Sequence, residues 1–217
     1  MPDTVKPAPK RRYHAPRRAA AAAQTRQTIV DAAKTRFEGF GWAGTTIRSI
    51  AADAEVSPKT IEALFTTKAG LLAAAVDYAI RGDIDETPVI RRESARAVEA
   101  APDAPTMLAR HAEYATTITS RSARIARVVE SAAASDDQVA ALWARMTHNR
   151  RFGARWAAET LLAKPGAPAG LTVEKAEQVF LIAIDWGTYR VLTEELGLTP
   201  DAARDWLHHY YRRMLLD

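Results

Sequence analysis

The sequence contains no cysteine, which excludes disulfides and thiolate metal sites. This absence fits the reducing cytoplasm, where we expect the protein to act. No apolar run approaches the roughly 18 residues that a membrane-spanning helix needs, so we expect no membrane partner. The basic N-terminus lacks the apolar segment of a secretory signal. Glycine is sparse, at 10 of 217 residues, in an alanine-rich sequence, which favours an all-helical protein.

Patterns typical of enzymes are also missing. The sequence has no cysteine nucleophile, no G-x-S-x-G motif and no phosphate-binding glycine loop. His208 and His209 are adjacent, so on a helix they point about 100° apart and cannot hold one metal ion from the same face. We therefore expect a protein that is not an enzyme, with no cofactor and no metal site.

Positive charge is concentrated at the N-terminus. Residues 1–18 hold six basic residues and one acidic residue, a net charge of +5, whereas the whole chain carries +4. Four of the 11 prolines lie there without hydrophobic periodicity, so we expect this segment to be disordered. It is either a solubilising extension or an arm that binds DNA phosphates or a minor groove, and an adjoining DNA-binding pattern favours the arm. The arm's proposed DNA contacts are Lys10, Arg11, Arg12, Arg17 and Arg18.

Residues 45–68 have the pattern of two short helices joined by a tight turn. Thr45 or Thr46 can cap the first helix, and Ser57 can cap the second, which begins with Pro58. Apolar residues recur at helical spacing in both segments. This pattern predicts a helix-turn-helix, in which the second helix enters the major groove of DNA. The outward residues of that helix are Lys59, Thr60, Glu62 and Ala63.

Further residues in and around this segment resemble the N-terminal DNA-binding domain of the TetR family of bacterial transcriptional regulators. The resemblance covers about residues 24–80 by the order and spacing of motifs. Glu55 departs from it, because the family usually has glycine there, and we expect a strained backbone at this position. Glu62 replaces a usual phosphate-contacting tyrosine, so it either points away or accepts a hydrogen bond from cytosine. The matching residues are Phe40-Gly41, Thr45-Thr46, Ile50-Ala51, Ala54, Val56-Ser57, Thr60, Phe65, Lys68 and Leu71.

The resemblance implies double-stranded DNA as a partner. Lys59, Thr60 and Glu62 would then face base edges. For Lys68, a solvated charge is an equal alternative to a phosphate contact. The residues expected to position the DNA backbone are Thr45, Thr46, Arg48, Ser57 and Lys68.

Helical periodicity continues along the rest of the chain. We expect an irregular stretch at residues 81–104 that contains a short helix. The predicted fold is all-α, with an N-terminal three-helix DNA-binding domain at residues 19–66 joined to a larger helical ligand-binding and dimerisation domain at residues 67–217. The other helices are expected at about 20–40, 68–80, 103–118, 120–134, 137–163, 172–196 and 200–215.

The segment at residues 179–192, VFLIAIDWGTYRVL, is apolar on more than one face. Either the core of a monomer or a partner subunit must cover it. The resemblance implies a four-helix bundle between two subunits, and recognition of a half-site also requires two copies, so we expect a homodimer. Asp185 interrupts the apolar run and needs a partner, for which structural pairing is favoured over a ligand. The expected interface residues are Ile184, Trp186, Tyr189, Trp206 and Tyr210.

In the family that the chain resembles, the helices before this segment enclose a pocket for a small-molecule effector. Aromatic and methionine side chains among a few polar groups suit such a ligand, although ordinary core packing explains many of them. We expect a repressor released from a palindromic operator by an unidentified ligand. The alternative is an architectural, largely sequence-indifferent DNA-binding protein that uses the basic tail. The candidate ligand-binding residues are His111, Tyr114, Thr117, Arg124, Trp143, Met146 and Trp156.

Overall fold

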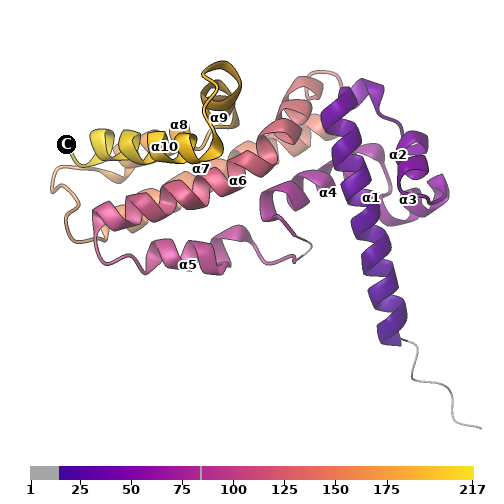
Figure 1. Cartoon of the computed structure of the whole chain (residues 1–217), viewed down its shortest axis with the longest axis horizontal. Helices are drawn as coiled ribbons and strands as arrows, with labels where there is room; N and C mark the ends of the chain where they lie inside the picture. The colour runs from indigo at the N-terminus through magenta and orange to yellow at the C-terminus, as the bar shows by residue number, and fades with distance from the viewer. Residues whose placement is uncertain (1–14, 84) are drawn as a thin grey trace, which may run out of the picture.

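The computed structural model describes residues 15–83 and 85–217, which form helices and connecting loops without a strand (Figure 1). The all-α prediction is confirmed for this part of the chain. The N-terminal helices are α1 (Ala15–Gly44), α2 (Ile47–Asp53), α3 (Pro58–Phe65) and α4 (Lys68–Arg81). The remaining helices are the 3₁₀ turn η1 (Val89–Arg91), α5 (Glu93–Glu99), α6 (Ala104–Ala132), α7 (Asp137–Leu162), α8 (Val173–Ala183), α9 (Trp186–Arg190), the π-helical turn η2 (Val191–Glu195) and α10 (Pro200–Leu215).

Side-chain caps set the boundaries of the two short helices. The Thr46 hydroxyl accepts a hydrogen bond from the Ser49 N–H, and the Ser49 hydroxyl accepts one from the Thr46 N–H. Ser57 caps α3 by accepting from the Thr60 N–H at 3.1 Å. In the turn between these helices, Glu55 has a φ of 53°. The strained backbone expected there is confirmed, because a non-glycine residue occupies the left-handed region.

One hydrophobic core joins the first four helices to the larger part of the molecule. Phe37, Ile50 and Ile61 are almost fully buried in it, together with Ile125 and Val129 from α6. Helix α4 packs against both α1 and α6. A second core lies at the other end of α6, where α6, α7, α8 and α10 meet. The position of the N-terminal helices is therefore coupled through close packing to α4 and α6.

Helix α6 is a single helix, which corrects the two helices expected at residues 103–118 and 120–134. No proline or glycine interrupts it after its first turn, and its hydroxyl groups bond back to its own carbonyl groups. Thr119 Oγ1 donates to the Ala115 carbonyl at 2.9 Å, and Ser122 Oγ donates to the Ile118 carbonyl at 2.8 Å. Because these hydroxyls are satisfied along the helix, they do not end it.

The segment expected as one helix at residues 172–196 is divided between α8 and α9. Asp185 causes the division, because its carboxylate accepts a hydrogen bond from the Gly187 N–H at 2.7 Å and caps a new helix. The same carboxylate forms an ion pair with Arg150 of α7. The structural pairing favoured for Asp185 is confirmed by this contact.

The start of α1 corrects the expected extent of disorder. Residues 15–18, which were assigned to the disordered arm, form the first turn of the helix. The alanine run that follows them favours helix and allows it to extend this far. Lys10, Arg11 and Arg12, and the side chain of Arg17, lie outside the described part of the chain, whereas Arg18 is exposed on α1.

Candidate functional site

Helix α3 presents a polar outer face. Lys59 and Glu62 are exposed, and Thr60 is half-buried with its hydroxyl 2.9 Å from that of Ser57. On the opposite face, Ile61 and Phe65 are buried in the core and fix the rotation of the helix. The arrangement leaves the predicted reading residues of α3 directed outward on a rigidly packed short helix.

The N-terminal part of α1 lies beside this outer face. Thr25 of α1 shares a shallow groove with Lys59 and Thr60 of α3. The Arg26 guanidinium lies 4.5 Å from the ring centroid of Phe65, which anchors α1 to α3. The first turns of α1 project beyond α2 and α3 (Figure 1). The basic N-terminal segment therefore joins the chain next to the face that carries Lys59 and Thr60.

The residues expected to contact the DNA backbone fall into different environments. Arg48 is exposed, and Thr46 is exposed while it caps α2. Thr45 is only 1% exposed, and its hydroxyl donates to the Gly41 carbonyl at 2.8 Å. The Thr45 side chain is therefore a structural element at the end of α1, and it has no surface to offer a phosphate.

The Lys68 ammonium group is partly buried, and only part of its hydrogen-bonding capacity is used. Its ammonium group donates to the Trp42 carbonyl and lies 4.0 Å from the centroid of the Trp42 ring. Partial burial lowers its pKa. An ammonium group has three N–H donors, so a phosphate contact remains open to Lys68. The contact that the structure records ties the start of α4 to the end of α1.

A cavity of about 460 Å³ lies between α4, the loop after it, α6 and α7. This volume is within the range of small-molecule sites, about 300–1,000 Å³. Its wall is largely apolar and includes Ile80 of α4, Ile118 of α6 and Trp186 of α9. His111 and Tyr114 of α6 add polar groups. The cavity thus has the size and composition of a site for a mostly apolar ligand.

Three of the seven predicted ligand-binding residues line this cavity, namely His111, Tyr114 and Met146. Thr117 and Arg124 are exposed and are not among its lining residues, which removes them as candidates for this site. Trp143 and Trp156 support the wall instead. Trp143 packs 5.8 Å from Trp186, and Trp156 packs 6.2 Å from His111, measured between ring centroids.

The prediction missed the contribution of α4 and the loop that follows it. Asp77, Ile80 and Arg81 of α4 line the cavity, as do Val89 and Ile90 of η1. The one available signal was the apolar Val-Ile pair within an otherwise polar, irregular stretch. Asp77, Ile80 and Arg81 belong to α4, the helix that follows α3, so one wall of the cavity is formed by a helix joined to the DNA-binding helices.

Burial controls the charge of the polar groups in the cavity. His111 is 2% exposed, and burial lowers its pKa to about 3, so the imidazole is neutral near pH 7. Burial also raises the pKa of Tyr114 to about 12, which keeps its hydroxyl protonated. Nearer the surface, Arg145 and Asp77 form an ion pair with an N–O distance of 3.2 Å.

The sequence profile of a family described as "Bacterial regulatory proteins, tetR family" matches residues 29–75, from the middle of α1 into α4. Residues 29–75 therefore form a domain of the tetR family. This match supports a DNA-binding regulator whose DNA-binding helices lie in the matched segment. No curated protein matches the sequence.

Solved structures have the same tetR-family fold. A proposed transcriptional regulator from Saccharomonospora viridis, solved with choline, is 18% identical with a TM-score of 0.67, over 89% of this chain and 98% of its own. A TetR transcription regulator from Haloarcula marismortui is 18% identical with a TM-score of 0.62, over 88% and 98%. A TetR-family member from Streptomyces coelicolor is 20% identical with a TM-score of 0.59, over 86% and 98%. At these identities the similarity establishes the fold alone.

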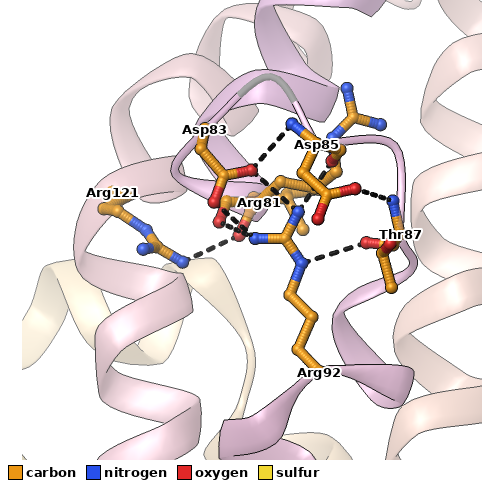
Figure 2. Close-up of polar contacts among 7 residues, drawn as sticks. Arg81, Asp83, Asp85, Thr87, Arg92 and Arg121 are labelled. Carbon is orange, nitrogen blue, oxygen red and sulfur yellow. Dashed lines mark hydrogen bonds and ion pairs between the residues drawn. The ribbon is translucent and has the colours of Figure 1, made fainter.

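Arg92 connects the end of α4 to the start of α5 (Figure 2). Its guanidinium donates to both carboxylate oxygens of Asp83 and to the carbonyl oxygens of Arg81, Asp85 and Thr87, over 2.7–3.0 Å. All five of its N–H groups are thereby used. These hydrogen bonds raise the pKa of Arg92 and lower that of Asp83. The loop that Arg92 holds contains residues of the cavity wall.

Arg121 of α6 also contacts the end of α4 (Figure 2). It donates to the Ile80 carbonyl at 2.9 Å, so the last turn of α4 is bonded to α6. Gly82 ends α4 with a φ of 82°, and a Cβ atom there would lie 2.2 Å from a guanidinium nitrogen of Arg121. The left-handed backbone favours glycine at this position, and a larger residue would also have to displace the Arg121 guanidinium.

The residues expected at a dimer interface divide between the surface and the interior. Trp206 is 40% exposed on α10, and its ring stacks on Tyr210 with centroids 5.3 Å apart. Trp186 is 6% exposed, and its Nε1 donates to Ser122 Oγ at 3.0 Å. Trp186 therefore belongs to the core of its own protomer, which corrects its assignment to the interface. Ile184 is half-buried and lines the cavity, and Tyr189 is half-buried beside it.

Metal-binding clusters and membrane-spanning helices are two further features that the described residues could contain. Residues 15–83 and 85–217 contain no cluster of three or more His, Asp or Glu side chains arranged to hold a metal ion. Over the same residues, no single helix is long and apolar enough to cross a membrane. Helices α3 and α4 pass that criterion only as a pair bent by 72°, and both contribute to the core.

Proposed function

We propose that this tetR-family regulator is a homodimeric repressor that a small molecule releases from a palindromic DNA operator in the cytoplasm. The observation that carries the proposal is the position of the cavity, whose wall includes the last turn of α4. Two residues separate the start of helix α4 from the end of α3, the helix with the exposed polar face. A ligand in the cavity therefore contacts the element that follows the proposed reading helix.

The DNA-binding part of the proposal rests on α3. Lys59 and Thr60 would read base edges in the major groove, and Glu62 is exposed where it can accept a hydrogen bond from a cytosine amino group. Thr46, Arg48, Ser57 and Lys68 would contact the sugar-phosphate backbone. The basic N-terminal segment would add electrostatic attraction.

The dimer part of the proposal rests on exposed apolar side chains near the C-terminus. Ile182 of α8 is 58% exposed, and Met214 of α10 is 47% exposed. Trp206 and Tyr210 also lie on α10, and Trp206 is exposed. Large apolar side chains in this number on neighbouring helices support burial against a second copy. Two copies would place two α3 helices against successive half-sites of a palindrome.

Release would follow if the ligand prefers one spacing of the two α3 helices over another. A ligand shifts such an equilibrium only by its difference in affinity for the two arrangements. Packing of α4 between α1 and α6 supports this route, because a displacement of α4 moves close-packed neighbours.

Selection of bound duplexes from a random DNA library tests the proposal. The purified wild-type protein should select a palindromic sequence and prefer it to scrambled DNA by about a thousandfold or more. The double variant Lys59→Ala, Thr60→Ala should lose that preference while its melting temperature and dimeric state stay unchanged. Lys175→Ala, an exposed lysine on α8, is the matched control and should retain the preference.

Selection of no common sequence, together with a steep salt dependence, would instead identify an architectural DNA-binding protein. A double variant that still discriminates operator from scrambled DNA would exclude Lys59 and Thr60 as the reading residues.

A further inference from the structure

The chemistry of the cavity wall indicates which class of molecule it takes. Most of the wall is apolar, with Ile80, Ile118, Met146 and Trp186 among its residues. Burial of apolar ligand surface against such side chains is the main source of affinity in small-molecule sites. A matching ligand is therefore mostly hydrocarbon or aromatic.

The charges around the cavity compensate one another. Arg145 is paired with Asp77 at 3.2 Å, and Arg150 is paired with Asp185, which stands behind it. Arg81 and Glu86 also line the cavity and have opposite charges, so the charged groups around it sum to zero and give no net attraction for an ion of either sign. The charged side chains at or directly behind the wall, three of each sign, are Arg81, Arg145, Arg150, Asp77, Glu86 and Asp185.

One aromatic face of the cavity wall, that of Trp186, already has a cation over it. The Arg150 guanidinium carbon lies 5.3 Å from the centroid of the Trp186 ring. A cation over an aromatic face gains its attraction from the ring's negative quadrupole, and here the protein's own guanidinium supplies that cation. A ligand ammonium group at the Trp186 face would have to replace the Arg150 guanidinium, so a cation is disfavoured at this ring.

Three cavity-lining residues have a buried polar atom without a hydrogen-bond partner, namely Arg81 Nε, Arg150 Nε and His111 Nδ1, and His111 is the one whose side chain is neutral near pH 7. His111 is 2% exposed and lines the cavity, and its Nδ1 is buried without a hydrogen bond. Around it pack the rings of Phe180 and Tyr211, with centroids at 4.7 and 5.4 Å. A buried polar atom without a partner is destabilising, and a ligand oxygen that bonds to it removes this penalty.

The neutral state of the imidazole decides what kind of oxygen fits. A carboxylate would require a cation beside it, and His111 supplies none near neutral pH. A hydroxyl group can donate to or accept from Nδ1, whichever tautomer is present, and a carbonyl oxygen can accept from the Nδ1–H tautomer. Both groups are uncharged.

We propose that the cavity takes an uncharged, mostly apolar molecule with a single hydroxyl or carbonyl oxygen, oriented by a hydrogen bond to His111 Nδ1. This inference rests on the proposed function in one respect, namely that the bound molecule is the effector of the regulator. Binding to the cavity itself does not require DNA, so it is measured with the full chain in the absence of DNA.

Three probes with the same alkyl chain separate the alternatives by calorimetry near neutral pH: 1-octanol, octanoate and octylammonium. Octanol should bind at least about tenfold more tightly than either ion, because each ion loses hydration in a mostly apolar cavity whose surrounding charges sum to zero. Tighter binding of octanoate or octylammonium, or no binding of any probe up to its solubility limit, would overturn the proposal.

Substitutions of His111 test the hydrogen bond. His111→Phe keeps an aromatic ring and should weaken octanol binding by about tenfold, whereas His111→Asn places an amide near the position of Nδ1 and should restore most of it. His148→Asn, which changes an exposed histidine of α7, is the matched control and should bind octanol as the wild type does. Unchanged octanol binding by a folded His111→Phe variant would exclude the hydrogen bond.

NMR of the wild-type protein provides the same test if His111→Phe does not fold. The imidazole nitrogen resonances of His111 should shift when octanol is added, and unshifted resonances under saturating octanol would reject the contact. Because all these measurements omit DNA, a failed operator selection leaves them valid. Equally, a failure of octanol to bind leaves the DNA-binding proposal intact.

Discussion

The Arg92 guanidinium donates two hydrogen bonds of 2.8 Å to Asp83, one to each carboxylate oxygen. The remaining donors of the same guanidinium hold three backbone carbonyl groups, including that of Arg81 at the end of α4. Only a planar group with five donors can make this set of contacts at once. The loop between α4 and α5 therefore depends on one side chain for its conformation.

Arg92→Lys should loosen this loop. Lysine keeps the charge but loses the paired geometry and most of the carbonyl contacts, and we expect a loss of about 1–3 kcal/mol of stability. The melting temperature should fall by several degrees, and hydrogen exchange should accelerate for residues 82–92. Arg91→Lys is the control, because Arg91 is adjacent and exposed. Equal exchange in both variants would show that Arg92 does not fix the loop.

The basic N-terminal segment should contribute to the salt dependence of DNA binding. Residues 1–14 contain Lys6, Lys10, Arg11 and Arg12 and lie outside the described part of the chain, but α1 places their attachment beside α3. Each phosphate that a cation neutralises releases condensed counterions. Deletion of residues 1–14 should therefore weaken binding and reduce the slope of log K against log salt by about one to four units per subunit.

The control for this deletion removes the positive charge of the segment and keeps its length. A variant with these four basic residues changed to glutamine keeps the segment and should reproduce the loss. If the glutamine variant retains the wild-type slope in titrations from low to physiological salt, the segment is a solubilising extension and not a DNA-binding arm.

Local signals in the sequence predicted the DNA-binding helices well. Ser57 and Pro58 define the start of α3, and Thr67 caps α4 by accepting from the Gly70 N–H at 3.0 Å. These signals depend on residues within one helical turn, so tertiary context does not alter them. The left-handed backbone at Glu55 was predictable from the family resemblance, because the family usually has glycine at that position.

Features that depend on tertiary contacts were not predictable in this way. Asp185 was expected as an interruption in one helix, but its contact with Arg150 and its capping of Gly187 divide the helix in two. The cavity was placed only on the later helices because the packing of α4 against α6 has no signature in sequence. Trp186 was assigned to a subunit interface because an apolar helix face does not reveal what covers it.

His111 should make the stability of the protein depend on pH above the range in which carboxylates titrate. Burial lowers its pKa from 6.5 to about 3, so the unfolded chain binds a proton at a higher pH than the folded protein does. Above pH 6.5 both states are neutral and the group has no effect. As the pH falls below 6.5, protonation stabilises the unfolded chain, by up to about 1.4 kcal/mol per pH unit.

Chemical denaturation at a series of pH values between about 7 and 5 measures this effect, because carboxylates contribute little there. The wild-type free energy of unfolding should fall by roughly 2 kcal/mol over this range on account of His111. His111→Gln cannot be protonated and should lose that part of the decline, even if its stability at neutral pH is lower. His148→Gln removes an exposed imidazole instead and should keep the wild-type decline. Parallel curves for wild type and His111→Gln would show that the folded protein admits a protonated His111, so that the cavity beside it is more polar than its lining indicates.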